Sequence, residues 1–140
     1  MSVSFLYGNL AVSNVLQPNV LLYAAVAFFA GLGRELVITL RDVEGDKKIG
    51  ARTLPMILGP KKTVMMTSVL ITIGVFFSLI PLLHPVHPAY LVAVIITDGL
   101  FLAGSYYALL SQKRETLQKA RHLTLYGMLK GVAAFAALGL

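Results

Sequence analysis

Several kinds of residue are missing or scarce in this chain. It has no cysteine, which excludes disulfides, thiolate metal sites and cysteine nucleophiles. Charged residues make up only 13% of the sequence, whereas an ordinary soluble domain has about a quarter. Acidic residues are the rarer sign, with six Asp and Glu against twelve Lys and Arg. This balance argues against a water-soluble domain.

Long apolar runs dominate what is present. Hydrophobic residues supply 57% of the 140 positions, and a helix needs roughly 20 apolar residues to span a bilayer. The runs are continuous rather than alternating, which favours helices over a membrane barrel. We therefore predict an all-α membrane protein, a single domain over residues 1–140. Its expected spans are residues 20–40, 63–83, 89–110 and 122–140.

The N-terminal residues 1–14 are too short for a complete span. We interpret them as the end of a span or as an interfacial stub, and we expect that the N-terminal part has been cut. No signal peptide is expected, because a basic leader and a small-residue cleavage site are missing from residues 1–10.

The distribution of basic residues predicts the topology. Segments 41–62 and 111–121 are both basic and are separated by two predicted crossings, whereas residues 84–88 contain no Lys, Arg, Asp or Glu. The positive-inside rule places both basic segments in the cytoplasm, in a multi-pass protein of the cell membrane. We therefore expect the net charge of +6 to favour binding of membrane lipids and diphosphates, and we expect no nucleic-acid partner.

The acidic residues are clustered. Glu35, Asp42, Glu44 and Asp46 are four of the six and lie within twelve residues. On a helix, Glu35, Asp42 and Asp46 would share a sector of roughly 40°. Two carboxylates four residues apart can hold Mg²⁺, whose coordination is usually completed by water and substrate phosphates. The simpler alternative is that these are solvated loop charges.

Basic side chains accompany this carboxylate stripe. Arg34 and Arg41 lie about a quarter turn away, where they could bind phosphate oxygens bidentately, or form purely structural ion pairs with the acids. Gly45 and Gly50 are expected to interrupt the helix. The remaining basic residues that extend the charge are Lys47, Lys48 and Arg52.

The same stretch resembles the second aspartate-rich motif of the UbiA superfamily of intramembrane prenyltransferases. The matching residues are Gly33-Arg34-Glu35-Leu36, Asp42-Val43-Glu44-Gly45-Asp46, Lys48-Ile49-Gly50-Ala51-Arg52-Thr53-Leu54-Pro55 and Gly59, together with the end of the chain from Tyr126 to Phe135. The likeness is greatest to the archaeal ether-lipid branch of the superfamily. It implies the C-terminal half of a nine-helix bundle, and the first motif, of the NDxxDxxxD type, is missing. Ile38, Thr39 and Arg41 depart from the pattern.

The resemblance implies a function for the stripe. We expect Mg²⁺-dependent transfer of a geranylgeranyl group from its diphosphate to a lipid acceptor such as geranylgeranylglyceryl phosphate. Asp42 and Asp46 would be the catalytic metal ligands, with Glu35 as a third candidate. The residues expected to bind the diphosphate are Arg34, Arg41, Lys47, Lys48 and Arg52. An aromatic or quinone-precursor acceptor is the alternative.

Several other residues each have two possible interpretations. Asp98 is an acid within a predicted span, either functional or hydrogen-bonded to a neighbouring helix. The aromatic rings of Phe101, Tyr106 and Tyr107 would either stabilise a carbocation or pack. Gly127 and Gly131 permit close helix contact, which is weak support for a dimer.

Two further hypotheses concern the chain as a whole. A transporter is one, because residues 45–52 vaguely resemble the short basic loop of major-facilitator proteins. The other is a non-catalytic truncated half, or a half that assembles with a separate N-terminal half.

Overall fold

A computed structural model describes residues 2–12, 18–83 and 85–136, and every regular element among them is helical. This confirms the predicted all-α class. The elements are α1 (Ser2–Val12), α2 (Pro18–Lys48), α3 (Leu54–Leu58), α4 (Pro60–Leu79), the 3₁₀ turn η1 (Ile80–Leu83), α5 (Pro88–Leu110) and α6 (Arg114–Ala136).

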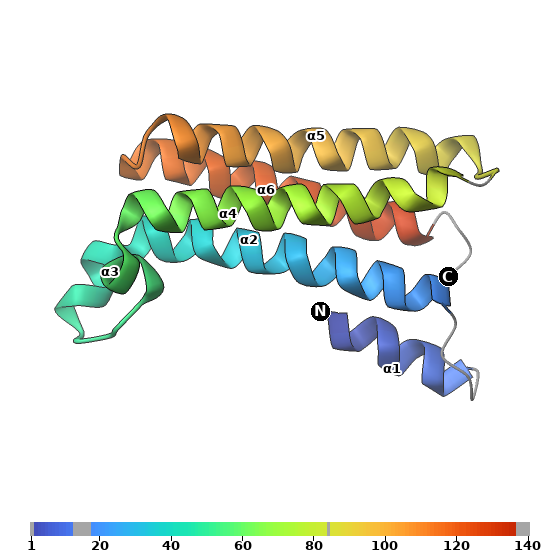
Figure 1. Cartoon of the computed structure of the whole chain (residues 1–140), viewed down its shortest axis with the longest axis horizontal. Helices are drawn as coiled ribbons and strands as arrows, with labels where there is room; N and C mark the ends of the chain where they lie inside the picture. The colour runs from blue at the N-terminus through green and yellow to red at the C-terminus, as the bar shows by residue number, and fades with distance from the viewer. Residues whose placement is uncertain (1, 13–17, 84, 137–140) are drawn as a thin grey trace.

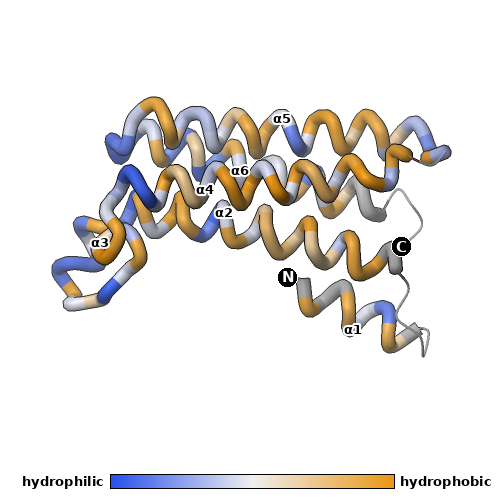
Figure 2. Tube along the Cα trace, viewed as in Figure 1, coloured by the Kyte–Doolittle hydropathy of each residue, from blue (hydrophilic) through white to orange (hydrophobic). Residues whose placement is uncertain are grey.

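Four long helices form an antiparallel bundle in which α2 contacts α4, α4 contacts α5, α5 contacts α6, and α6 returns to α2 (Figure 1). The short α1 packs on α2 alongside its N-terminal half. The connection through α3 and the turn between α5 and α6 lie at one end of the bundle, and η1 lies at the other. Hydrophilic residues gather at the α3 end, whereas apolar residues dominate the helices between the ends (Figure 2). The two basic segments therefore share one end, as the topology prediction required.

Three helices are long and apolar enough to cross a membrane, namely Val20–Lys48, Pro60–Leu83 and Pro88–Leu110. They correspond to the first three predicted spans. The fourth predicted span, residues 122–140, lies mainly on α6, which does not meet the same criterion within its described residues. Residues 137–140 of that prediction lie outside the described part of the chain. α6 differs because its first half carries Arg114, Glu115, Lys119 and Arg121.

α2 continues beyond the predicted span. Residues 41–48, expected to begin a loop, form its last two turns, and Gly45 lies inside the helix rather than interrupting it. The helix ends where Gly50 adopts a φ of 72°, a conformation that glycine accepts without steric cost. The backbone N–H of Ala51 closes the turn by donating to the Asp46 carbonyl, at 3.0 Å. Both Asp42 and Asp46 therefore lie on a continuous helix.

Small residues let the helices approach closely. A Cβ atom at Gly33 of α2 would lie 2.6 Å from Ile71 of α4, and one at Gly127 of α6 would lie 2.9 Å from the Phe101 ring of α5. A Cβ at Gly131 would lie 3.3 Å from the Thr97 methyl group of α5. The GxxxG pair thus packs α6 against α5 within this chain, which accounts for it without a dimer.

A cluster of buried side chains supports the basic end of the bundle. It joins α2, α4, α5 and α6 through Val37, Leu40, Val64, Ala108, Leu117 and Ala120. Nearby buried hydroxyl groups are satisfied within their own helices, since Thr63 and Thr67 each donate to the carbonyl four residues earlier, at 2.9 Å. In lipid such bonding avoids the cost of an unpaired polar group. The acidic end of α2 is therefore held on a packed base.

Candidate functional site

The carboxylate stripe lies on the outward side of α2. Glu35 and Asp42 have side chains that are 64% and 36% exposed, whereas Val37 and Leu40 on the opposite side are buried. Asp42 and Asp46 are four residues apart, which is about 6 Å of helix rise. The two aspartates thus present neighbouring carboxyl groups on a partly exposed face of α2.

Arg41 holds Asp42 in a bidentate ion pair. Its Nε atom donates to Oδ1 at 2.7 Å and its Nη2 atom donates to Oδ2 at 2.6 Å. The third nitrogen, Nη1, donates to Oε1 of Gln118 on α6 at 2.9 Å. Arg41 therefore crosslinks the end of α2 to α6. Both carboxylate oxygens of Asp42 accept hydrogen bonds in this arrangement.

Helix α6 adds basic residues that the sequence reasoning did not include in the site. The charges of Arg121 and Arg114 are close enough to act on the Asp42 carboxylate. Gln118 joins them through Arg41 and also lies 3.1 Å from Nε2 of His122. The sequence contained an indication of this proximity, because the topology prediction placed segment 111–121 on the same side of the membrane as Asp42. The packing of α6 beside α2 could not be predicted from the sequence.

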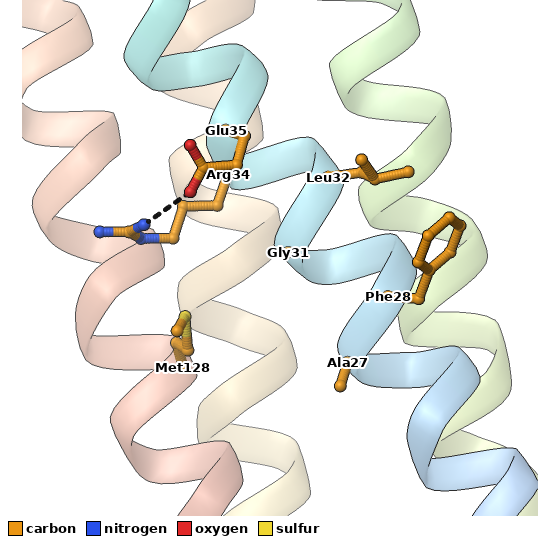
Figure 3. A pocket seen from close by; sticks show the side chains of 7 residues that line it. All are labelled: Ala27, Phe28, Gly31, Leu32, Arg34, Glu35 and Met128. Carbon is orange, nitrogen blue, oxygen red and sulfur yellow. Dashed lines mark hydrogen bonds and ion pairs between the residues drawn. The ribbon is translucent and has the colours of Figure 1, made fainter. Parts of the chain in front are cut away.

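Arg34 and Glu35 lie at a separate cavity of about 280 Å³ between α2 and α6 (Figure 3). Arg34 points from α2 toward α6, above Met128, and its Nη1 atom donates to Glu35 at 3.3 Å. Its Nε atom is buried and has no partner within the described residues. Seven residues separate Glu35 from Asp42, which is about 10 Å of helix rise. Glu35 is thus closer to Arg34 than to the aspartate pair.

The other predicted phosphate ligands lie near the end of α2. Lys47 and Lys48 occupy its last turn, and Arg52 follows in the connection to α3. All three side chains are exposed, and none forms an ion pair with the residues that the structure describes. Their charges are available at the surface of the basic end.

A larger cavity of about 530 Å³ lies on the other side of α2. Its lining on that helix includes Arg41, Glu44 and Lys47 but neither aspartate. At 100° per residue, Glu44 is about 160° around the helix from both Asp42 and Asp46. The end of α2 therefore has two distinct polar faces, and Arg41 lies between them.

Of the remaining candidates, Phe101 and Asp98 make contacts between helices, whereas Tyr106 and Tyr107 are exposed. The Phe101 side chain is buried and lies against Gly127, and Tyr106 and Tyr107 make an edge-on pair with ring centroids 6.4 Å apart. None of the three lines either cavity described above. Asp98 on α5 accepts a hydrogen bond from Ser78 on α4 at 2.6 Å, which matches the inter-helix alternative raised by the sequence.

The residues fit one side of a magnesium site. Within the described part of the chain, no group of three His, Cys, Asp or Glu residues could hold a metal ion. Mg²⁺ is commonly bound by one or two carboxylates together with water and substrate phosphates, and Asp42 and Asp46 supply two on adjacent turns. Each Asp42 oxygen accepts one hydrogen bond from Arg41, so Arg41 would compete with a metal ion for the lone pairs of this carboxylate.

Comparison with known proteins supports the resemblance. The model of the UbiA prenyltransferase family matches residues 1–129. A digeranylgeranylglyceryl phosphate synthase from Methanosphaera stadtmanae is 35% identical over 137 residues, which cover 96% of this chain and 49% of that protein. The protein of the same name from Archaeoglobus fulgidus is 33% identical over 98% of this chain and 48% of its own length. The chain thus spans about half the length of these curated relatives. No solved structure matches it significantly.

Proposed function

Because the chain belongs to the UbiA prenyltransferase family, we propose that it forms the C-terminal half of an intramembrane prenyltransferase. The observation that carries this proposal is the aspartate pair, Asp42 and Asp46, partly exposed on adjacent turns of α2 at the basic end of the bundle. The names of the relatives favour geranylgeranyl diphosphate as donor and a glyceryl phosphate lipid as acceptor. An aromatic acceptor is the alternative within the same family.

The proposed chemistry assigns each residue a task. Asp42 and Asp46 would hold Mg²⁺, and the metal, when bound, would supply positive charge to the diphosphate of the donor. Arg41 exchanges Asp42 for a phosphate oxygen and so adds a second cation to the leaving group. Lys47, Lys48 and Arg52 attract the anionic donor to the end of the helix. Arg34, deeper along α2, would contact the diphosphate only if the donor extends into its cavity.

The site proposed here needs a second wall. The stripe of α2 is partly exposed, and the chain covers about half of each relative, so a region that corresponds to the relatives' N-terminal half would cover the stripe and supply further ligands. This favours an assembling half over an independent transporter. We place the basic end, with residues 41–62, in the cytoplasm on the basis of the positive-inside rule.

The test is prenyl transfer in membranes that contain this chain together with the N-terminal half of the Methanosphaera relative. Labelled geranylgeranyl diphosphate and geranylgeranylglyceryl phosphate are supplied with Mg²⁺, and the product is counted. Asp42→Asn and Asp46→Asn should each lower the rate on the order of 100-fold, because each removes a charged ligand from the leaving group. Glu115→Gln, an exposed acid at the start of α6 that lines neither cavity, is the matched control. Full activity of both aspartate variants would refute the assignment.

A further inference from the structure

The larger cavity at the basic end is formed by four parts of the chain. It lies between α2, the α3 segment, the start of α4 and the turn before α6, and encloses about 530 Å³. Asp42 and Asp46 do not line this cavity, although two residues that the proposed transferase site also uses, Arg41 and Lys47, do.

Its charge favours an anion. Arg41, Lys47 and Arg114 line the cavity, against one acid, Glu44. Lys47 and Arg114 make no hydrogen bond or ion pair with other described residues through their side chains. Arg41 has five N–H donors, of which the pair with Asp42 and the bond to Gln118 use three. Several donors thus remain for phosphate oxygens.

The start of α4 adds to this field. Gly59 and Pro60 line the cavity, and Pro60 is the first residue of a 20-residue helix. The N-terminus of such a helix has a partial positive charge that favours anions. The basic side chains and the helix N-terminus, which come from different elements, thus both contribute positive charge to this cavity.

The apolar part of the lining indicates the source of the anion. Leu40, Val43 and Met56 contribute hydrocarbon to the same cavity. Directly after Met56 in α3, the side chains of Ile57 and Leu58 are 68% and 41% exposed. A soluble ion gains no binding energy from an apolar surface, whereas the hydrocarbon chain of a lipid can pack along it.

We propose that this cavity binds the anionic phosphate head group of a membrane lipid, at a site separate from the carboxylate stripe. Lys47, Arg114 and Arg41 donate to the phosphate oxygens, and the lipid chain leaves past Met56 and α3. Because Arg41 also pairs with Asp42, an occupied head-group site would draw its guanidinium toward the cavity. Lipid binding and release of Asp42 are therefore coupled through one side chain.

The experiment is native mass spectrometry of the full chain in detergent, titrated with phosphatidylglycerol and, in parallel, with phosphatidylcholine of the same chain length. Lys47→Gln combined with Arg114→Gln should weaken phosphatidylglycerol binding on the order of 10-fold. Lys62→Gln combined with Lys113→Gln is the matched control, since it removes the same charge from exposed neighbouring residues that do not line the cavity. The control should change binding by less than about twofold. Equal loss in the two pairs would show non-specific attraction and overturn the site.

Three further measurements identify the ligand and exclude a folding artefact. Glu44→Gln removes the acid from the lining and should tighten phosphatidylglycerol binding, and an unchanged affinity would contradict the proposal. Inorganic phosphate at millimolar concentration should not displace the lipid, and displacement would assign the site to a free anion instead. Asp42→Asn with Asp46→Asn should retain phosphatidylglycerol, so failure of the lipid site and failure of the transferase proposal are distinguishable.

Discussion

Arg41 and Asp42 are consecutive residues whose side chains form a closed bidentate pair, at 2.6 and 2.7 Å. The pair keeps the charge of Asp42 compensated at the end of a membrane helix, where an unpaired carboxylate would be costly. It also places a phosphate-binding group in direct contact with a proposed metal ligand. With a substrate that carries both metal and phosphate, Asp42 would bind the metal and Arg41 would bind the phosphate. The pair is therefore suited to exchange partners.

Substituting Arg41→Gln should expose this relationship. With the guanidinium removed, both Asp42 oxygens are free, and Mn²⁺ used as a magnesium substitute should bind several-fold more tightly. Prenyl transfer in the assembled enzyme should fall, because the donor diphosphate loses a cation. Electron paramagnetic resonance of free Mn²⁺ measures the affinity. Lys113→Gln removes the same charge from an exposed position and should leave Mn²⁺ binding almost unchanged, and an equal gain there would contradict the mechanism.

The contact between Gly127 and Phe101 should limit substitution at the glycine. In Gly127→Ala the new methyl group would lie 2.9 Å from the ring, and we expect a loss of about 1–3 kcal/mol in the free energy of unfolding. Gly99→Ala is the control because its Cβ would meet nothing within 4 Å, and it should gain up to about 1 kcal/mol from helix propensity. Thermal unfolding in detergent, followed by circular dichroism, measures both. Equal stabilities would rule out the close approach of α5 and α6.

The bond between Ser78 and Asp98 should be structural. A double-mutant cycle with Ser78→Ala and Asp98→Asn should give a coupling free energy of about 0.6 kcal/mol and at most about 1.7, as for other hydrogen bonds between membrane helices. Denaturation in mixed micelles supplies the four unfolding free energies. Transferase activity of the assembled enzyme should stay within about twofold, since a loss of about 1 kcal/mol leaves the folded state dominant. A large loss of transfer at unchanged stability would assign Asp98 to the reaction.

The absence of cysteine makes the topology directly testable. Single substitutions Lys62→Cys and Lys113→Cys lie at the α3 end of the bundle, and Val86→Cys lies at the η1 end. In intact cells a membrane-impermeant maleimide should label only Val86→Cys, because two crossings return the chain to the cytoplasmic side. The unsubstituted chain is the blank. Labelling of all three positions, or of the two lysine positions alone, would disprove the orientation.

Much of the fold could be predicted because the bilayer imposes simple requirements on a sequence. Apolar runs of sufficient length identified three spans, and charge asymmetry identified which connections share an end. The predictions were weaker where polar residues continue a helix. Residues 41–48 were expected to leave it, yet Gly45 costs only about 1 kcal/mol in a helix and packing of α2 on α4 and α6 outweighs that.

The membrane class, the helical spacing of Asp42 and Asp46, and the family could all be predicted from the amino-acid sequence. Local periodicity and a short motif are sufficient for these, since they depend on neighbours along one helix. Three features depend on how the helices pack: Arg41 joins Asp42 to Gln118, the charges of Arg114 and Arg121 act on Asp42, and Arg41 and Arg114 line one cavity. Those contacts join residues more than 70 positions apart, and only the packing of α6 against α2 brings them together.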